Sequence, residues 1–300
     1  MATLYTKQSS NIAKTWLLMA VFLVVVVLLG WFLSYYYNDP ALLVFAVVFS
    51  LVMNVWSYWF SDKVALAMSG AKPASREEYF DYYTTVENLS IAAGLPIPKI
   101  YVINDSAPNA FATGRNKKHA AVAATTGLLA MMNKTELEGV IAHELSHIGN
   151  RDILLSSVVV VLVGIVTLIA DWFIRISFFG GRRGGNREGE GANILAILGI
   201  IFIVLSPILA TIIQLAISRR RESLADTSGV LLTRYPEGLA SALEKISHYE
   251  QPMLKANNAT AHLFISNPFG PHMKKVSPIA KLFMTHPPIE ERIAALREME

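Results

Sequence analysis

Two histidines four residues apart, with a glutamate beside the first, are the most specific chemical signal in this sequence. They are His143, Glu144 and His147, in the order His-Glu-x-x-His. Residues four apart lie on one face of a helix, so both imidazoles can converge on one metal ion while Glu144 lies beside it. This spacing is typical of zinc hydrolases, in which the glutamate is the general base. The simpler alternative is an ordinary helix with two hydrogen-bonded surface histidines.

The residues around the motif predict a helix. Thr135 and Glu138 have the spacing of a capping box, and Gly149-Asn150 is a typical stop. Apolar residues recur between them at helical spacing, namely Leu137, Val140, Ile141, Leu145 and Ile148.

A catalytic zinc needs a third protein ligand and an open position for water. The sequence has no cysteine, so disulfides are excluded and the third ligand is a carboxylate or another histidine. Glu222 is preferred because it lies on an expected helix just after a long apolar run, with Asp226 one turn further on. Asp226 could then accept a hydrogen bond from a ligating imidazole. Alternatively, both acids are solvated charges that pair with Arg219 or Arg220.

Composition indicates a membrane protein. The chain is 53% hydrophobic and 16% charged, with a mean hydropathy of +0.41. Its net charge of +3 and its scattered basic residues give no support for nucleic-acid binding. Lipid headgroups are the expected counter-charges of the basic residues, so a lipid bilayer is an expected partner.

Two uncharged runs near the N-terminus, 15–38 and 40–61, are each long enough to span a bilayer. We interpret the first as an anchor and not as a cleaved signal peptide, because it lacks a small-x-small cleavage site. The turn at Asp39 has no basic residue, whereas basic residues flank the pair. These are Lys7, Lys14, Lys63, Lys72 and Arg76. The positive-inside rule then predicts that the part of the chain after the second run faces the cytoplasm.

A second pair of apolar runs, 153–170 and 191–218, follows the motif. We expect it to form a transmembrane hairpin; two buried core helices, or a re-entrant hairpin, are the alternatives. The predicted organisation is a two-span anchor (1–62), a first catalytic part with the motif (63–152), the hydrophobic hairpin (153–218) and a second catalytic part with the third ligand (219–300).

Between these apolar pairs the pattern predicts α/β structure. The expected elements are a helix over 76–93, a strand over 99–103, a hairpin of 109–113 with 119–124 that turns at 114–116, and a short helix from residue 126. After the second pair we expect a helix from Pro236 to about Glu250, a mobile stretch over 257–278, and a last helix that begins at Pro287-Pro288 and runs through Leu296.

Several stretches together carry a family resemblance. They are Asn109-Ala110-Phe111-Ala112-Thr113-Gly114-Arg115, Thr125-Thr126-Gly127-Leu128-Leu129, Glu136-Leu137-Glu138-Gly139-Val140, Asn150-Arg151-Asp152, Arg221-Glu222-x-x-Ala225-Asp226 and Thr285-His286-Pro287-Pro288. With the His-Glu-x-x-His motif, the whole chain resembles the HtpX-type heat-shock membrane metalloproteases. More distantly, it is similar to the CAAX prenyl endopeptidases.

The resemblance implies a mainly α membrane protein with four hydrophobic segments and an α+β zincin-like (gluzincin) catalytic domain with a small β-sheet. It implies one Zn²⁺ per chain, held by His143, His147 and Glu222, with Glu144 as general base and Asp226 as support for a ligand. The expected substrate strand at the edge of the cleft comprises Asn109, Ala110, Phe111 and Ala112. The resemblance also implies that His286 returns to the site to stabilise the oxyanion; alternatively, it caps a helix.

The expected function is therefore a zinc endopeptidase in a bacterial inner membrane, with several spans and a cytoplasmic catalytic domain. Its substrates would be membrane or misfolded proteins, in quality control or stress response. A prenyl-dependent processing protease is the first alternative, disfavoured because only four apolar segments are present to build a lipid cavity. A non-proteolytic, metal-binding membrane transporter or regulatory scaffold is the second. It is disfavoured because the motif lies outside the apolar runs, where a transport path would need its ionisable groups.

Overall fold

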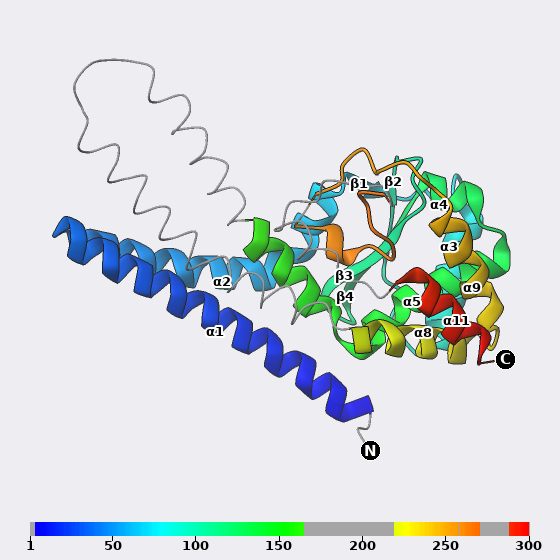
Figure 1. Ribbon diagram of the computed structural model, residues 1–300, viewed down its shortest axis with the longest axis horizontal. Helices are drawn as coiled ribbons and strands as arrows, with labels where there is room; N and C mark the ends of the chain where they lie inside the picture. Colours follow the sequence, from blue (N-terminus) through cyan, green and yellow to red (C-terminus); the bar gives the residue numbers. More distant parts are fainter. Residues whose placement is uncertain (1–3, 165–218, 258, 271–287, 300) are drawn as a thin grey trace, which may run out of the picture.

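The computed structural model describes residues 4–164, 219–257, 259–270 and 288–299, and it joins a long helical pair to an α+β domain (Figure 1). Helices predominate, and the sheet is small and mixed. The predicted third and fourth apolar segments lie outside the described residues except for 153–164. His286 also lies outside them.

The helical pair consists of α1 (Leu4–Tyr37) and α2 (Ala41–Met68). Both helices have the length and the apolar composition of membrane spans, as the sequence predicts. They pack closely at Gly30, where an added Cβ would clash with the Cβ of Ala46. The turn between them contains Asn38 at a φ of 51°, and the Asp39 carboxylate accepts a hydrogen bond from the N–H of Ala41 at 2.9 Å.

The sheet has four strands in the order β1-β2-β4-β3, so β3 is an edge strand. The strands are β1 (Ala71–Pro73), β2 (Lys99–Ile103), β3 (Ala110–Asn116) and β4 (His119–Thr125). Strand β2 pairs with β4 in parallel, and the other two pairings are antiparallel. The sequence predicted β2 and the β3–β4 hairpin, but it did not predict β1.

The predicted turn of this hairpin at residues 114–116 is wrong. Those residues belong to β3, where the register shifts between Gly114 and Asn116. The chain turns instead at Lys117-Lys118, because the Asn116 side chain accepts hydrogen bonds from the N–H groups of Lys118 and His119, at 3.0 and 3.1 Å. Gly114 permits the irregularity with its φ of 144°.

Both faces of the sheet are buried, in two separate clusters. On one face, Ile100 and Val122 pack against α5 (Lys134–Asn150) and its neighbours. On the other face, Phe111 and Ala123 pack against the end of α2 and the segment around Phe264. This double burial explains why β4 is a continuous run of small apolar residues and does not alternate with polar ones.

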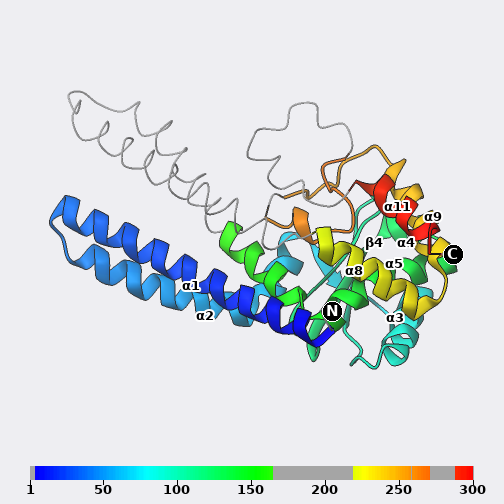
Figure 2. The same ribbon diagram turned by 60° about the horizontal axis from the view of Figure 1, so that its bottom comes forward.

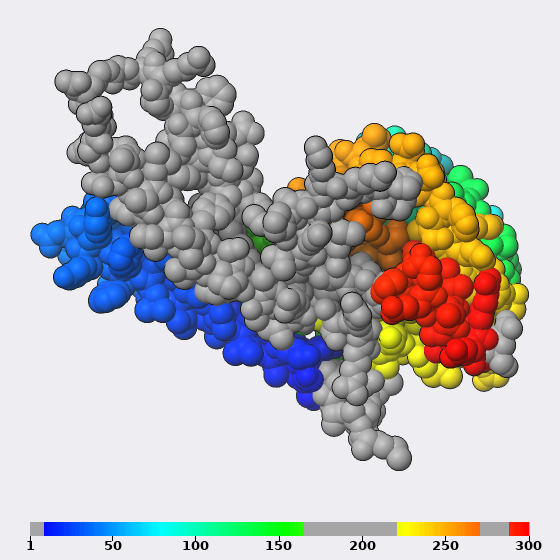
Figure 3. Space-filling model, viewed as in Figure 1, coloured from blue at the N-terminus to red at the C-terminus, as the bar shows by residue number. Residues whose placement is uncertain are grey.

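The remaining helices of the described residues are α3 (Phe80–Ala92), α4 (Thr126–Met131), the helix Ile153–Gly164, α8 (Arg219–Thr233), α9 (Pro236–Ser247), a short 3-10 helix (Ala261–Leu263) and α11 (Ile289–Arg297). Of these, α8, α9 and α3 pack against α5. Figure 2 shows α8 crossing beside α5, with α11 and α9 adjacent to each other at the C-terminal end of the domain. In the space-filling view this end lies far from the outer end of the blue helical pair (Figure 3).

Two expectations about this region are corrected. The helix expected over 76–93 begins only at Phe80, after a turn over 76–79. Of the stretch expected to be mobile, 257–278, the structure describes only 257 and 259–270, and there Ala259, Thr260 and Phe264 are fully buried. In this described part, tight turns alternate with apolar residues that fill the space under the sheet.

Candidate metal centre

Helix α5 carries the His-Glu-x-x-His motif and is fixed at both ends. Asn133 caps its N-terminus by accepting from the N–H of Glu136, and the Glu136 side chain accepts from the N–H of Asn133. The predicted capping pair, Thr135 and Glu138, is therefore wrong by two residues, because the helix already begins at Lys134. At the other end the chain reverses at Arg151, with a φ of 58°.

The two imidazoles converge as the spacing predicts. Nε2 of His143 and Nε2 of His147 are 3.1 Å apart. Glu222 brings its carboxylate to them from α8, with Oε2 at 3.7 Å from His143 Nε2 and Oε1 at 3.8 Å from His147 Nε2. These three side chains form a group that could hold a metal ion.

Small residues on α8 allow this approach. Ala225 is fully buried, and an added Cβ at Gly229 would lie 3.1 Å from the backbone nitrogen of His143. The two helix backbones therefore cross closely where α8 carries Glu222, two turns before Gly229.

The donor atoms are close enough together for a zinc site. With zinc–nitrogen and zinc–oxygen bonds of about 2.0–2.1 Å, ligand atoms in a tetrahedron lie about 3.3 Å apart. The two imidazole nitrogens are 3.1 Å apart, and they lie 3.7 and 3.8 Å from different oxygens of Glu222. One ligand atom from each of the three residues lies within 4.8 Å of the other two. Two neutral imidazoles with one carboxylate is also a ligand set of catalytic zinc.

Each imidazole has its own orienting carboxylate on the opposite ring nitrogen. Asp226 lies 2.8 Å from Nδ1 of His143, as expected for a residue that supports a ligand. Asp152 lies 3.0 Å from Nδ1 of His147, and no role had been assigned to it from the sequence. These contacts place the proton on Nδ1 and leave Nε2 free to bind a metal.

Arg292 is a residue of the site that the sequence analysis did not predict. This residue of α11 is 4% exposed, and its Nε and Nη2 donate to the two oxygens of Asp226 at 2.9 and 2.7 Å. Its Nη1 donates to the carbonyl of Ile265 at 3.3 Å and lies 3.7 Å from Glu222. A single arginine on an amphipathic helix gives no local signal of such a role. The sequence also allowed Glu222 and Asp226 to pair with Arg219 or Arg220 instead. The side chains of these two arginines lie outside the described part of the structure.

The charges around the site favour a bound cation. Among the described residues, four buried carboxyl groups and two guanidinium groups lie around it; they are Glu144, Asp152, Glu222 and Asp226 with Arg221 and Arg292. Burial disfavours the charged form of His147, but the carboxylates of Asp152, Glu222 and Glu144 outweigh this effect and raise its pKa to about 10. A metal ion bound at Nε2 would take the place of the proton that these carboxylates stabilise.

Glu144 has the environment of a general base. It is 1% exposed, and its Oε2 has no hydrogen-bond partner among the described residues. Burial raises its pKa to about 8, an effect that the neighbouring His147 partly opposes. A buried carboxylate with an unpartnered oxygen and a pKa near neutrality is suited to take up and release a proton.

A small cavity joins these groups. Its volume is about 30 Å³, and Ala112, Glu144, His147, Glu222, His262 and Leu263 are among the residues that line it. It has room for about one water molecule. His262 was also not anticipated; it is buried, with Nε2 2.9 Å from the carbonyl of Ser156.

The predicted substrate strand, residues 109–112, lies at the edge of the sheet, and its residues have different surroundings. Ala112 lines the cavity beside Glu144. The carbonyl of Ala110 accepts from the N–H of Ile265 at 3.0 Å. Phe111 points to the opposite face of the sheet, where it packs edge-to-face on Phe264 with the ring centroids 5.1 Å apart.

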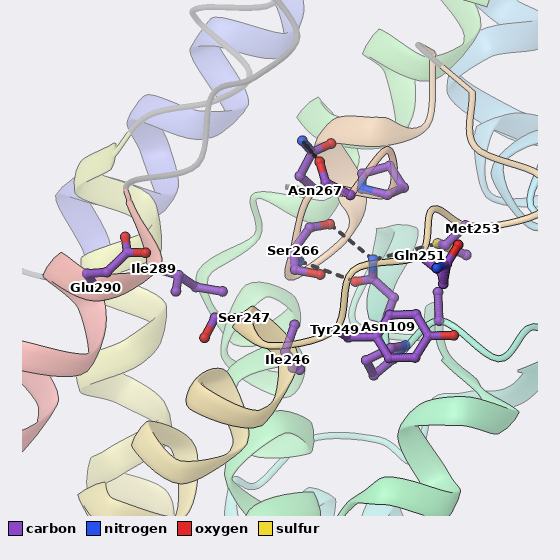
Figure 4. A pocket seen from close by; sticks show the side chains of 14 residues that line it. Asn109, Ile246, Ser247, Tyr249, Gln251, Met253, Ser266, Asn267, Ile289 and Glu290 are labelled. Atoms are coloured by element: carbon purple, nitrogen blue, oxygen red, sulfur yellow. Dashed lines mark hydrogen bonds between the residues drawn. The ribbon is translucent and has the colours of Figure 1, made fainter. Parts of the chain in front are cut away.

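Asn109 holds the main chain of Ser266. Its side chain accepts from the N–H of Ser266 at 3.2 Å and donates to the carbonyl at 3.0 Å (Figure 4). A larger cavity of about 170 Å³ opens beside this contact, between the start of β3 and the first turn of α11. The chain's own segment 265–266 thus occupies the start of the β3 edge, and Ala112 is the part of the predicted strand that reaches the metal centre.

Comparison with known proteins gives one family. Residues 81–300 match the model of peptidase family M48. The chain is 48% identical over 300 residues to a protease HtpX homolog of Thermoanaerobacter pseudethanolicus, covering 99% of this chain and 98% of the relative. Protease HtpX homologs of Dictyoglomus turgidum and Thermococcus sibiricus are both 45% identical, over 99% and 89% of this chain and 95% and 90% of the relatives. A crystal structure of S. mikatae Ste24p matches with a TM-score of 0.48 and 17% identity, over 97% of this chain and 67% of that chain.

Proposed function

The chain belongs to peptidase family M48, and we propose that it is a membrane-bound zinc endopeptidase that acts on the cytoplasmic side of its membrane. Its proposed substrates are membrane proteins and misfolded proteins. Family membership and the protease names of its relatives support peptide-bond hydrolysis. The side of the membrane, the metal and the physiological role are proposals.

One observation carries the proposal. His143 and His147 present their Nε2 atoms 3.1 Å apart, and Glu144 lies beside them with a buried, unpartnered carboxylate oxygen. An ordinary surface helix would hydrate these side chains. Here they are desolvated and directed at one point, which suits a metal site with a base next to it.

His143, His147 and Glu222 would hold the zinc, whose chemistry when bound is to lower the pKa of a water molecule and to polarise a carbonyl group. Glu144 takes a proton from the attacking water and then transfers it to the leaving amine. Its desolvation supports both steps, because a raised pKa makes the protonated form accessible near neutral pH. Asp226 and Asp152 hold the imidazoles in the tautomer that this binding needs. His286 remains proposed as the group that stabilises the oxyanion.

The position of the site supports substrates at a membrane surface. The side chain of Asn11 on α1 donates to the carbonyl of Asn150, the last residue of α5, at 3.3 Å. The helix Ile153–Gly164 leaves α5 at an angle of 89° and packs against Leu18 and Phe22 of α1. The motif therefore ends where the spans begin, within reach of the loops and ends of membrane proteins.

The cytoplasmic orientation and the role rest on different arguments. Basic residues flank the two spans, and the turn at Asp39 has none, which favours a cytoplasmic domain in a bacterial inner membrane. A role in membrane-protein quality control or stress response is proposed from the resemblance to heat-shock proteases. No observation favours a prenyl-dependent protease or a transporter over this function.

The test is the variant Glu144→Gln, purified with zinc and given an unfolded model polypeptide. Because amide replaces carboxylate, the proton acceptor is lost while His143, His147 and Glu222 remain. We expect cleavage to fall by a factor of about 10²–10⁴ with unchanged zinc content. The matched control is Glu138→Gln on the same helix, which should cleave like the parent. Cleavage by Glu144→Gln at the parental rate would refute the mechanism.

A further inference from the structure

The tip of the β3–β4 hairpin, residues 115–119, lies against the membrane-spanning helix α2. The guanidinium group of Arg115 sits 4.3 Å from the ring centroid of Trp59. The next aromatic ring on α2, that of Phe60, has the ammonium group of Lys63 at 5.1 Å. Two cations therefore meet the aromatic residues of the span, and Trp59 itself is 49% exposed.

The hairpin runs along α2 toward the apolar part of the span. At its inner end, Phe111 clusters with Ala65 and Leu66 near the end of α2, whereas Arg115 reaches Trp59. Four residues of strand cover about 13 Å, and the seven residues of helix from Leu66 back to Trp59 cover about 10 Å. Measured along α2 toward the apolar part of the span, the turn at Lys117-Lys118 therefore lies at the depth of Trp59 or deeper. Tryptophan at a span end marks the headgroup layer.

The charge of this tip is almost entirely positive. Residues 59–63 and 115–119 contain the cations Lys63, Arg115, Lys117 and Lys118, and Asp62 is their only acidic residue. Lys118 is exposed. The Asn116 side chain fixes the turn that presents the two lysines, through its hydrogen bonds to the N–H groups of Lys118 and His119.

We propose that this tip is a binding site for anionic phospholipid headgroups, which we call the hairpin-tip site; it comprises Arg115, Lys117 and Lys118 beside Trp59. The lysines pair with the phosphodiester and the anionic headgroup in the layer that Trp59 marks, where the Arg115 guanidinium is stacked on the indole. The site needs α2 to cross a membrane, but it does not depend on peptidase activity. It would anchor one end of β3 in the headgroup layer, three residues after Ala112 reaches the metal centre.

The experiment titrates the purified full-length protein in detergent with phosphatidylglycerol or phosphatidylcholine and counts bound lipids by native mass spectrometry. The tip variant is Lys117→Gln with Lys118→Gln. The matched control is Lys134→Gln with Arg234→Gln, which removes the same charge from exposed positions on α5 and after α8, away from the spans. Asn116 is left unchanged in both, so the turn keeps its hydrogen bonds.

We expect the parent and the control to bind phosphatidylglycerol more tightly than phosphatidylcholine. The tip variant should bind phosphatidylglycerol about tenfold more weakly than the parent. Phosphatidylcholine affinity should be equal in all three. If the double variant melts below the parent, each single lysine variant is titrated instead, with a loss of about three- to fivefold. Parental phosphatidylglycerol affinity in the tip variant, an equal loss in the control, or no preference between the two lipids would overturn the proposal.

Discussion

The two imidazoles of the candidate metal site, those of His143 and His147, are oriented by carboxylates that are themselves held in different ways. Both carboxylate oxygens of Asp226 accept hydrogen bonds from the guanidinium group of Arg292. Asp152 reaches His147 because the chain reverses at Arg151, which places it directly after the end of α5. A left-handed backbone conformation is costly for any residue other than glycine, so its occurrence at Arg151 beside the site is consistent with a functional constraint on that turn. Burial raises the pKa of Asp226, but Arg292 and His143 outweigh this effect and lower it to about 2, so this carboxylate stays ionised near neutral pH.

At this scale we predict a graded loss of zinc. Glu222→Ala leaves two imidazoles and should lose metal most readily. Asp152→Ala should weaken zinc affinity by about 10- to 100-fold, because it removes only the carboxylate that orients His147. Asp226→Ala should weaken zinc affinity in the same way and should also lower the free energy of unfolding by about 3–5 kcal/mol, because it leaves the buried guanidinium of Arg292 without its carboxylate partner. Zinc content after mild chelation and thermal unfolding measure both effects. Parental zinc retention by Glu222→Ala would mean that another residue, with His286 the first candidate, completes the site.

Among the elements, α5 depends on glycines where other helices cross it. An added Cβ at Gly139 would lie 2.6 Å from the backbone nitrogen of Leu239, at the start of α9. An added Cβ at Gly229 of α8 would lie 3.1 Å from the backbone nitrogen of His143. These crossings bury α5 on several sides and set the distance from which α8 presents Glu222. The positions of the ligands therefore depend on backbone packing as well as on side-chain identity.

Gly139→Ala should destabilise the protein. The contact is with backbone atoms, which cannot move aside, so overpacking should cost about 1–3 kcal/mol, only partly offset by the higher helix propensity of alanine, worth about 1 kcal/mol. Gly149→Ala on the same helix is the control. Nothing lies within 4 Å of its added Cβ, so it should melt at or above the parental temperature. Equal melting temperatures for the two variants would show that the α5–α9 crossing is not tightly packed.

At the scale of the whole molecule, the catalytic domain is built directly onto the spans. The sheet face around Phe111 is covered by the end of α2 and by Val160 of the helix that follows α5. A second cluster joins that helix to α1. The domain is thus packed against the helical pair and not connected to it by a linker, so packing sets the position of the candidate metal site relative to the two helices. Figure 1 shows the domain lying directly against one end of the pair.

Topology can be tested because the native chain has no cysteine. In intact cells, Asp39→Cys should react with a membrane-impermeant thiol reagent, because it lies in the turn between the two spans. Lys134→Cys, exposed at the start of α5, should react only after the membrane is permeabilised. The opposite labelling pattern would place the catalytic domain outside the cytoplasm.

The sequence by itself determined whatever depends on local periodicity. Four-residue spacing on one helix fixes the relative positions of His143 and His147 whatever the helix packs against, and the structure confirms their convergence. The length of an apolar run likewise decides whether a helix can span a bilayer, and α1 and α2 have that length. Strand β2 and the helix from Thr126 were also predicted, because each is delimited by turn residues close in sequence.

Only the tertiary structure decided which distant groups meet. It places Glu222 at the imidazoles, selects Arg292 as the partner of Asp226, and lays Ile265 on the edge at Ala110. On the sequence alone, Glu222 and Asp226 were equally consistent with solvated charges. The physical reason is that such contacts come from the packing of whole elements, set by many small side chains and close backbone crossings, and no spacing within one segment encodes them.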